Sequence, residues 1–374
     1  MKIQYSNCRL CPRRCGVNRE AGQRGYCGET SDLRIAFAGI HRGEEPPVSG
    51  KGGSGTIFIS GCNLGCVFCQ NYQLSSGKRL SYSKQLSSGE QLPQDTATFG
   101  RVVDTPEFAG ICLSLQEQGA VNINIVTGSH AAPAIGEGIA EARKRGLLIP
   151  VVWNSSGYEG EETLEILKEF VDIYLPDLKT LDTEVAAKFF NAPDYPEYAA
   201  AAIKKMMGFR ELRFGTSVDN EPAPEVMLSG VIIRHLIIPD YIESTRQVLA
   251  WFAEHCIDND HCNGDEHWFD SDHGSSGGYG TDSGHGNSGH SRSRALLSLL
   301  TQYTPVRIPG VKTEIPSRFL SESEYDMVLF MLEEFGIDEG YCQELVTGSE
   351  WLPDFMRSNP FASKLSLPVW HFKK

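Results

Sequence analysis

Short apolar runs rich in β-branched residues alternate along most of the chain with longer segments whose apolar residues recur every three or four positions. The first pattern predicts buried strands, and the second predicts amphipathic helices. We expect strands at 56–59, 121–126, 149–153, 171–175, 231–238 and 296–300. One expected helix has Thr105 as its N-cap and Pro106 as its first residue, and others cover 133–145, 161–170, 183–190, 195–207 and 243–255. This alternation predicts an α/β fold of about six parallel strands joined by right-handed crossovers, too few for a complete eight-stranded barrel.

Two segments interrupt the alternation. Residues 75–100 are rich in Ser, Gln, Gly and Lys, lack clear periodicity and are interpreted as an insertion or surface lid. Residues 257–294 are biased toward Gly, Ser, His and Asp, with few apolar side chains to offset the entropy of ordering, so we expect a disordered loop. Irregular spacing favours disorder over a transition-metal site for the histidines of this loop, which are His261, His267, His273, His285 and His290.

These features predict three parts of the chain. Residues 1–54 form a small cysteine-rich unit and a connecting strand at 33–40, and residues 55–310 form the β/α unit with both insertions. Residues 311–374 form a C-terminal extension with an amphipathic helix at 324–335 and an aromatic end, 351–372, expected to pack across the β/α unit. With 374 residues, 40% of them hydrophobic, one large α/β core with elaborations is favoured over two equal domains.

Charge and cysteine content narrow the classes of protein. A net charge of −14 argues against general nucleic-acid binding, which needs a basic surface. Seven of the 11 cysteines fall in two tight clusters before residue 70, and the chain has no leading basic-then-apolar signal segment. Clustered cysteines in a reducing compartment are usually metal ligands, so a cytoplasmic protein is expected. No apolar run approaches the roughly 20 residues that span a membrane.

The most informative stretch follows the strand at 56–59. Cys62, Cys66 and Cys69 have C-x3-C-x2-C spacing, which brings three thiolates toward one soft metal centre. Three ligands suit an iron–sulfur cluster with one iron open to another ligand. The alternative is part of a structural zinc site, which would need a fourth Cys or His nearby; the next in the chain is Cys112.

A second group of cysteines lies near the start of the chain. Cys8, Cys11, Cys15 and Cys27 are interspersed with turn-forming glycines and Pro12, which suits a small metal knuckle. Four thiolates are compatible with zinc and with a second iron–sulfur cluster, and ligand type alone does not separate the two. Unligated thiols are disfavoured because closely packed free cysteines oxidise readily. The remaining cysteines are interpreted as buried or incidental thiols: Cys112, Cys256, Cys262 and Cys342.

The cysteine motif, with Phe68 just before its last cysteine, resembles the signature of radical S-adenosylmethionine (SAM) enzymes. Residues 60–64 and 68–71 are similar to the PflX-like branch, relatives of the pyruvate formate-lyase activating enzymes. The resemblance covers nearly the whole chain apart from the insertions and extends to residues 8–17, 154–158, 172–179, 234–236 and 351–355. It implies a partial (β/α)6 barrel in which Cys62, Cys66 and Cys69 hold a [4Fe–4S] cluster whose open iron binds SAM. Reductive cleavage of SAM would then give a 5′-deoxyadenosyl radical that takes a hydrogen atom from a substrate.

The resemblance also implies a set of SAM-binding residues at the strand ends. Phe68 would pack near the adenine, and Gly128-Ser129-His130 stands where many relatives carry Gly-Gly-Glu, which contacts the SAM amino group. Asn154 and Ser155 would hold the methionyl carboxylate side, with Lys179 as a carboxylate partner beside Asp177. Arg234 and His235 alternate in one strand, so one of the two can point into the barrel, and His235 is interpreted as either a ligand contact or a buried core histidine. No residue is assigned a catalytic role of its own.

The leading hypothesis is therefore a radical SAM oxidoreductase, in its most specific form one that installs a glycyl radical on a protein partner. A radical enzyme that modifies a peptide or small molecule is a second hypothesis, and a non-catalytic iron–sulfur electron carrier is a third. Expected partners are a protein or peptide substrate and a low-potential electron donor such as flavodoxin or ferredoxin.

Overall fold

The computed structural model describes residues 5–75, 99–215, 225–257, 293–349, 351–361 and 364–373. The insertion expected at 75–100 and the loop expected at 257–294, with its histidines, lie almost wholly outside the described residues.

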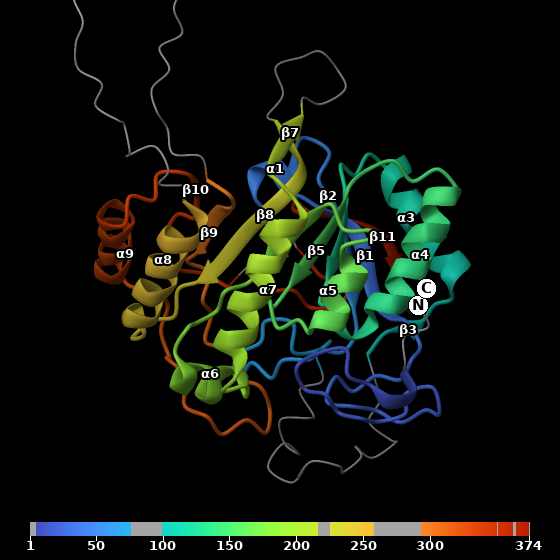
Figure 1. The fold of residues 1–374 in the computed structure, drawn as a ribbon, viewed down its shortest axis with the longest axis horizontal. Coiled ribbons are helices and arrows are strands. Elements are labelled where there is room, and N and C mark those ends of the chain that lie inside the picture. The colour runs from blue at the N-terminus through green and yellow to red at the C-terminus, as the bar shows by residue number, and fades with distance from the viewer. Residues whose placement is uncertain are drawn as a thin grey trace, which may run out of the picture.

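Parallel strands form the centre of the molecule (Figure 1). They lie side by side in chain order and match the six strands expected from the sequence: β2 (Ser54–Ile59), β4 (Ile123–Val126), β5 (Val151–Ser155), β6 (Ile173–Pro176), β8 (Val226–Leu236) and β9 (Leu296–Leu300). The fold class is confirmed, because the strands and intervening helices form an α/β partial barrel.

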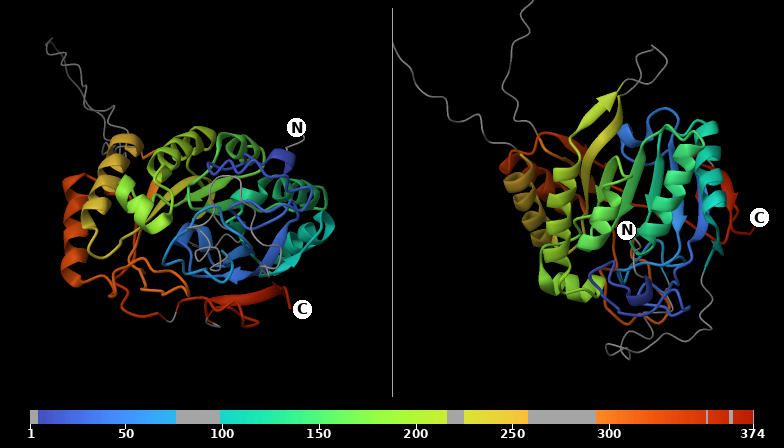
Figure 2. Two further views of the ribbon diagram at one scale, coloured as in Figure 1. Left: turned by 90° about the horizontal axis from the view of Figure 1, so that it is seen from below. Right: turned by 45° about the vertical axis from the view of Figure 1, so that its right-hand side comes forward.

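Helices connect successive parallel strands and follow the outer face of the curved sheet (Figure 2). Their bounds are α3 (Thr105–Glu117), α4 (Ala132–Lys144), α5 (Glu161–Leu167), α6 (Thr183–Phe190), α7 (Tyr195–Phe209) and α8 (Ile242–Cys256). The N-cap of α3 is Asp104, one residue before the expected Thr105, and its side chain accepts a hydrogen bond from the Glu107 backbone N–H. None of the described helices has the length and apolar content needed to cross a membrane.

Additional strands extend the sheet at both edges. At one edge β1 (Arg34–His41) pairs antiparallel with β2, and β11 (Ser366–His371) pairs antiparallel with β1. At the other edge β10 (Gly340–Cys342) lies parallel to β9. Two short strands lie off this path, β3 (Arg101–Val102) on β1 and β7 (Arg213–Gly215) on β8. The C-terminal extension therefore supplies a strand at each edge, with α9 (Glu322–Glu334) packed beside α8.

The core has two layers. The larger apolar cluster lies between the sheet and the helices and includes the fully buried Trp153 and Phe108. A smaller cluster inside the barrel, formed by Val152, Ile173 and Ile232, packs on Val48 of α1 (Pro46–Ser49). Because α1 lies opposite the C-terminal strand ends in Figure 1, this cluster fills one end of the barrel and leaves the other end for a site.

Candidate active site at the strand ends

A cavity of about 320 Å³ occupies the barrel interior on the side of the C-terminal strand ends. This volume is at the lower end of the range of small-molecule sites. Cysteines of the loop after β2 line it, and so do polar residues of β5 and β8 and of the segment just after β6. His41, the last residue of β1, and Glu44 just after it line the cavity too. The C-terminal tail contributes Trp351, Pro353, Phe361 and Leu365. The predicted cluster loop and the predicted strand-end residues therefore share one cavity.

The cysteine loop is held by backbone hydrogen bonds to neighbouring segments. Gly65 and Val67 donate to the carbonyls of Phe190 and Phe189 at the end of α6. Gly61, at the start of the loop, has a φ of +87°, a conformation that favours glycine. A Cβ there would lie 2.8 Å from the Cys27 carbonyl oxygen. Gly61 is therefore required both by the turn and by the close approach of the N-terminal segment.

Cys62, Cys66 and Cys69 all line this cavity, as the sequence predicts. Among the described residues, no three Cys, His, Asp or Glu side chains are grouped so that they could hold a single metal ion. A four-iron cluster does not need such a grouping, because each cysteine binds a different iron. Burial raises the pKa of the Cys66 thiol, so its thiolate needs a positive partner such as bound iron. The donor set fits an iron–sulfur cluster better than a lone zinc ion.

Phe68 is buried within the loop and lines the cavity. Its ring packs edge-on against Phe189, Phe190 and Tyr303, with the closest centroid, that of Tyr303, 5.2 Å away. These contacts fix an aromatic surface beside the cysteines, in the place where the resemblance puts the adenine of SAM.

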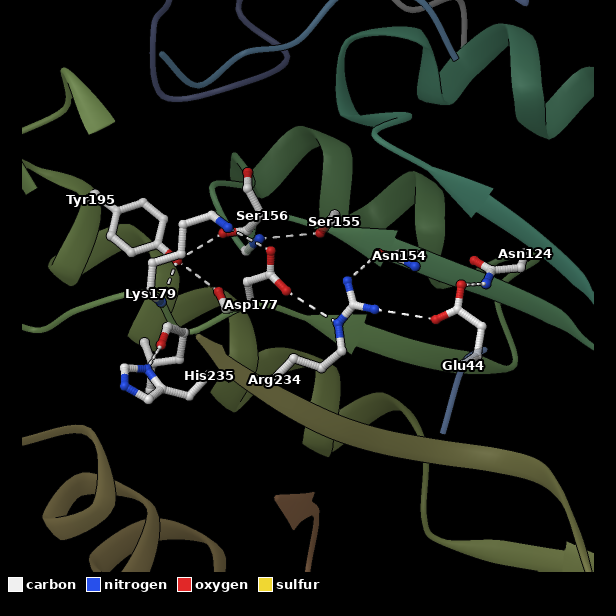
Figure 3. A network of polar contacts seen from close by, with 12 residues as sticks. Glu44, Asn124, Asn154, Ser155, Ser156, Asp177, Lys179, Tyr195, Arg234 and His235 are labelled. Atoms are coloured by element: carbon white, nitrogen blue, oxygen red, sulfur yellow. Dashed lines mark hydrogen bonds and ion pairs between the residues drawn. The ribbon is translucent and has the colours of Figure 1, made fainter. Parts of the chain in front are cut away.

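A chain of charged side chains crosses the cavity (Figure 3). Lys179 Nζ lies 2.6 Å from Asp177 Oδ2, and Arg234 Nε lies 3.2 Å from Asp177 Oδ1. Burial acts to raise the pKa of Asp177, but the charges of Lys179 and Arg234 outweigh it and leave the pKa below its ordinary value. Asp177 is therefore ionised at neutral pH and holds both cations in fixed positions.

Arg234 extends this network toward the opposite wall. Its guanidinium donates to Asn154 Oδ1 and forms an ion pair with Glu44 Oε2 at 3.4 Å. Asn124 Nδ2 donates to the other Glu44 oxygen at 3.1 Å. Burial raises the pKa of Glu44, against the opposing charge of Arg234. Glu44 was not among the site residues expected from the sequence, because no local motif marks it.

Asn154 and Ser155, at the end of β5, line the cavity as expected. Ser155 Oγ accepts a hydrogen bond from the Gly157 N–H at 3.2 Å, which closes the turn after the strand. The Tyr195 hydroxyl of α7 lies 2.8 Å from the Ser156 carbonyl oxygen and 2.7 Å from the Asp177 carbonyl oxygen. One tyrosine thus ties the ends of β5 and β6 together beneath the polar side chains.

His235 has the second of the two expected placements, that of a buried core histidine. Its ring is buried between β8 and α8, with Nδ1 2.7 Å from the Leu178 carbonyl oxygen and Nε2 2.9 Å from Thr245 Oγ1. Burial lowers the pKa of His235 to about 4, so the ring is neutral at physiological pH. Arg234 is the member of this pair that lines the cavity, because side chains alternate along a strand. This placement does not support a cofactor contact by His235.

Gly128, Ser129 and His130 also lie outside the set of residues that line the cavity. Ser129 and His130 belong to a short 3-10 turn, η2 (Ser129–Ala131). Ser129 Oγ donates to the buried Glu159 carboxylate at 2.8 Å, and His130 Nε2 lies 2.8 Å from the Ser60 carbonyl oxygen. Thr127, the preceding residue, does line the cavity. The turn therefore supports the site from behind, and these contacts do not favour the expected role in binding the SAM amino group.

The N-terminal segment, with Cys8, Cys11, Cys15 and Cys27, lies below the C-terminal strand ends in Figure 1, beside the cysteine loop. Cys8, Cys11 and Cys27 are buried and Cys15 is partly buried, and all four are free thiols. The carbonyl oxygen of Cys27 accepts a hydrogen bond from the Cys62 N–H at 3.4 Å. The two groups of cysteines are therefore in direct backbone contact.

Comparison with known proteins gives one family match and one curated relative. Residues 56–215 match the model of the radical SAM superfamily. The "Uncharacterized protein MJ0674" of Methanocaldococcus jannaschii is 28% identical over 255 residues, which cover 68% of this chain and 64% of that protein. The chain thus spans somewhat less than two thirds of the curated relative.

Solved structures with detectable similarity include SuiB of Streptococcus suis, with a TM-score of 0.41, 10% identity and coverage of 78% of this chain and 48% of SuiB. A domain of the pyruvate-formate lyase-activating enzyme from Bacteroides vulgatus has a TM-score of 0.33 and 12% identity, covering 57% of this chain and 91% of that domain. The family match includes the cysteine loop and the strands β4, β5 and β6 with their polar ends. Residues 56–215 of this chain are therefore similar to the radical SAM superfamily.

Proposed function

We propose that the chain is a radical SAM enzyme with its cluster on Cys62, Cys66 and Cys69. The observation that carries the proposal is the sharing of one cavity by these three thiols and by the polar ends of β5 and β6. Once bound, the cluster and SAM supply one-electron cleavage of the sulfonium and a 5′-deoxyadenosyl radical that abstracts hydrogen.

Residues of this chain would bind and orient SAM. Lys179 is cationic, lies close enough to Cys66 for the two charges to interact, and is held by Asp177. It is suited to pairing with the SAM carboxylate. Asn154 and Ser155 offer neutral polar groups next to it, and Phe68 offers an aromatic surface for the adenine.

The remaining walls would keep water away from the reacting atoms. Phe58, Leu74, Ile238 and Leu300 line the cavity with apolar side chains, and Phe361 of the tail closes one side. A dry cavity matters here because a primary carbon radical must meet the substrate before any other hydrogen donor.

The most specific form of the proposal is activation of a protein partner by glycyl-radical formation. Similarity of residues 60–71, 154–158 and 172–179 to the activating-enzyme branch supports it. In this form the substrate is a polypeptide glycine, and a small low-potential protein such as flavodoxin or ferredoxin supplies the electron. A radical enzyme acting on a peptide or a small molecule would use the same cavity residues.

The test is anaerobic reconstitution with iron and sulfide, followed by reduction, addition of SAM and measurement of 5′-deoxyadenosine. We expect 5′-deoxyadenosine from the wild-type chain and none from Cys66→Ala. Cys342→Ala is the control and should also give product, because Cys342 is an exposed residue of β10. The proposal would be contradicted if no 5′-deoxyadenosine forms and if SAM does not change the electron paramagnetic resonance spectrum of the intact, reduced cluster. That outcome would favour an electron carrier.

A further inference from the structure

The N-terminal segment before β1 has almost no regular secondary structure. Between Tyr5 and Leu33 the described chain contains a single 3-10 turn, η1 (Tyr5–Asn7). Its own apolar cluster is small, consisting of Tyr5, Cys8 and Leu10 with Val17 and Ile166 at the edge. Segments of this size with so small a core usually depend on a disulfide or a metal. All four cysteines here are free, so a metal is the remaining cross-link.

Two tight turns bring the four cysteines of this segment together. One turn is closed by the Arg14 N–H donating to the Cys11 carbonyl, and the other by the Gly28 N–H donating to the Gly25 carbonyl. The turns face each other, because the Tyr26 N–H donates to Cys15 Sγ at 3.2 Å. Cys8, Cys15 and Cys27 all lie close enough to Cys11 to act on it electrostatically.

Arg19 is the most unusual residue of the segment, because its guanidinium is buried with 1% exposure. It donates to the backbone carbonyls of Glu29, Thr30 and His130, and its Nη1 lies 3.7 Å from Cys8 Sγ. Among the described residues, none of its hydrogen bonds or ion pairs goes to a carboxylate. Glu29, a nearby acid, instead pairs with Arg34 at 3.3 Å.

A buried charge without a counter-charge is costly, so Arg19 requires an anion beside it. Two ionisable groups contact its guanidinium, the Cys8 thiol and the Tyr5 phenol, whose ring centroid lies 4.6 Å away. Burial raises the pKa of Tyr5 and keeps it neutral, so the thiol is the group that can become anionic. Zinc or a four-iron cluster bound by four thiolates carries a net double negative charge. We infer that Cys8, Cys11, Cys15 and Cys27 hold an anionic metal centre and that Arg19 is its counter-cation. Each thiol releases its proton to solvent as the metal binds.

The arrangement of the thiols favours a cluster over a single zinc ion. No three of the described Cys, His, Asp or Glu side chains are grouped to hold one ion, although the four thiols are electrostatic neighbours. Cys62, Cys66 and Cys69 are likewise not grouped around one position. An iron–sulfur cluster can bind thiols spaced in this way, since each thiolate binds its own iron. The inferred centre is therefore a second iron–sulfur cluster.

This centre would also support the loop that carries Cys62, Cys66 and Cys69. Beyond the contact between Cys27 and Cys62, Arg13 donates to the Asn63 carbonyl at 3.0 Å and to the Asn191 carbonyl at 2.8 Å. One side of the cluster loop thus rests on the metal-bound turns. Loss of the N-terminal centre should loosen that loop, while loss of the other cluster should leave the N-terminal turns intact.

The first test measures iron, sulfide and zinc in protein reconstituted without SAM, so its outcome is independent of the proposed function. We expect Cys66→Ala to retain about half of the wild-type iron, and Cys11→Ala combined with Cys66→Ala to retain none. Cys342→Ala is the control and should match the wild type. If the protein contains stoichiometric zinc, the assignment of this site as an iron–sulfur cluster is wrong. If Cys66→Ala contains neither iron nor zinc, the four N-terminal cysteines do not hold a metal centre. If the double variant does not fold, the metal content of Cys66→Ala alone still shows whether the N-terminal cysteines bind a metal.

The second test addresses Arg19 through the reduction potential of the remaining cluster in the Cys66→Ala background. Replacing Arg19 with Met removes a positive charge near an anionic centre, so the potential should shift to more negative values. Arg9→Met is the control, since Arg9 lies between two of the cysteines in sequence but is exposed. A redox titration followed by electron paramagnetic resonance measures both reduction potentials. Equal potentials for the Arg19 and Arg9 variants would contradict the role of Arg19.

Discussion

At the scale of single residues, the site depends on Asp177, which holds both Lys179 and Arg234. The three side chains are between 14% and 20% exposed, so they are shielded from solvent but not sealed from it. Neither cation has another carboxylate partner among the described residues except Glu44, which pairs with Arg234. One substitution therefore releases two charges.

We predict that Asp177→Asn destabilises the protein by about 2 kcal/mol, below the cost of breaking a fully buried pair because of the partial exposure. Chemical denaturation measures this. Glu334→Gln, which breaks the exposed pair with Arg246, is the control and should cost about 0.5 kcal/mol or less. Asp177→Asn should also weaken SAM binding, measured by equilibrium dialysis; unchanged binding would argue that Lys179 does not need Asp177.

His235 gives a prediction about pH. Because burial lowers its pKa to about 4, the unfolded chain takes up a proton near the ordinary histidine pKa while the folded chain does not. Stability from this group is therefore lost as pH falls below about 6.5. Between pH 8 and pH 5 the wild type should lose about 2 kcal/mol more than His235→Gln. Parallel pH profiles of the two proteins would show that His235 does not carry this effect.

The same residue shows where prediction from sequence stops. The alternation of Arg234 and His235 was evident from the strand pattern, but the pattern does not say which face meets the barrel interior. That choice is made by the packing of α8, whose Thr245 meets the His235 ring. Glu44 was missed for a related reason, since its partners Asn124 and Arg234 are distant in sequence.

At the scale of elements, the cysteine loop depends on a glycine. A Cβ at Gly61 would lie 2.7 Å from Glu29 Cγ and 2.8 Å from the Cys27 carbonyl oxygen, in addition to the strain of its positive φ. Gly119 has a similar φ of +90° but nothing within 4 Å of the corresponding Cβ position. The two glycines share the backbone strain and differ in the contact.

We therefore expect Gly61→Ala to displace the loop from the N-terminal segment and to lower the iron content after reconstitution by at least half. Gly119→Ala should lose stability through backbone strain, about 1 kcal/mol, but keep its iron. Iron analysis and thermal denaturation of both variants separate the two effects. Similar iron contents would mean that the contact with Cys27 and Glu29 is dispensable.

Regular elements with strong patterns were predicted well. The strand at 296–300 and the helix at 183–190 have the expected bounds, because apolar runs and amphipathic periodicity record burial directly. β11 was missed because Pro368 and partly exposed positions disguise an edge strand. β7 and β10 have three residues each, too short for a pattern to appear. The proposed division of the chain at residues 54 and 310 stays a prediction.

At the scale of the whole molecule, the C-terminal tail completes the wall of the cavity, as far as the described residues show. Phe355, 1% exposed, packs on Phe58 of β2 with ring centroids 5.0 Å apart. Phe361 contacts both of these rings and also lines the cavity. The tail was expected to pack across the β/α unit, and it does so through this aromatic cluster.

Phe355→Ala should lower the free energy of unfolding by about 3 kcal/mol, because the tail cannot easily collapse into the space that the ring leaves. Phe330→Ala on α9 is the matched control, with a ring that is 65% exposed, and it should change stability by about 0.5 kcal/mol or less. Denaturant titration measures both. Equal effects would mean that the tail contributes little to holding the barrel together.

The pairing of β11 with β1 also has a consequence for biosynthesis. β1 is the first described strand to be synthesised and β11 is the last, so the edge of β1 that pairs with β11 stays uncovered until residues 366–371 have been made. During that time the nascent barrel exposes a row of unpaired backbone groups and an unfinished cavity wall. Pairing of β11 with β1 is therefore the late step of folding that covers this edge.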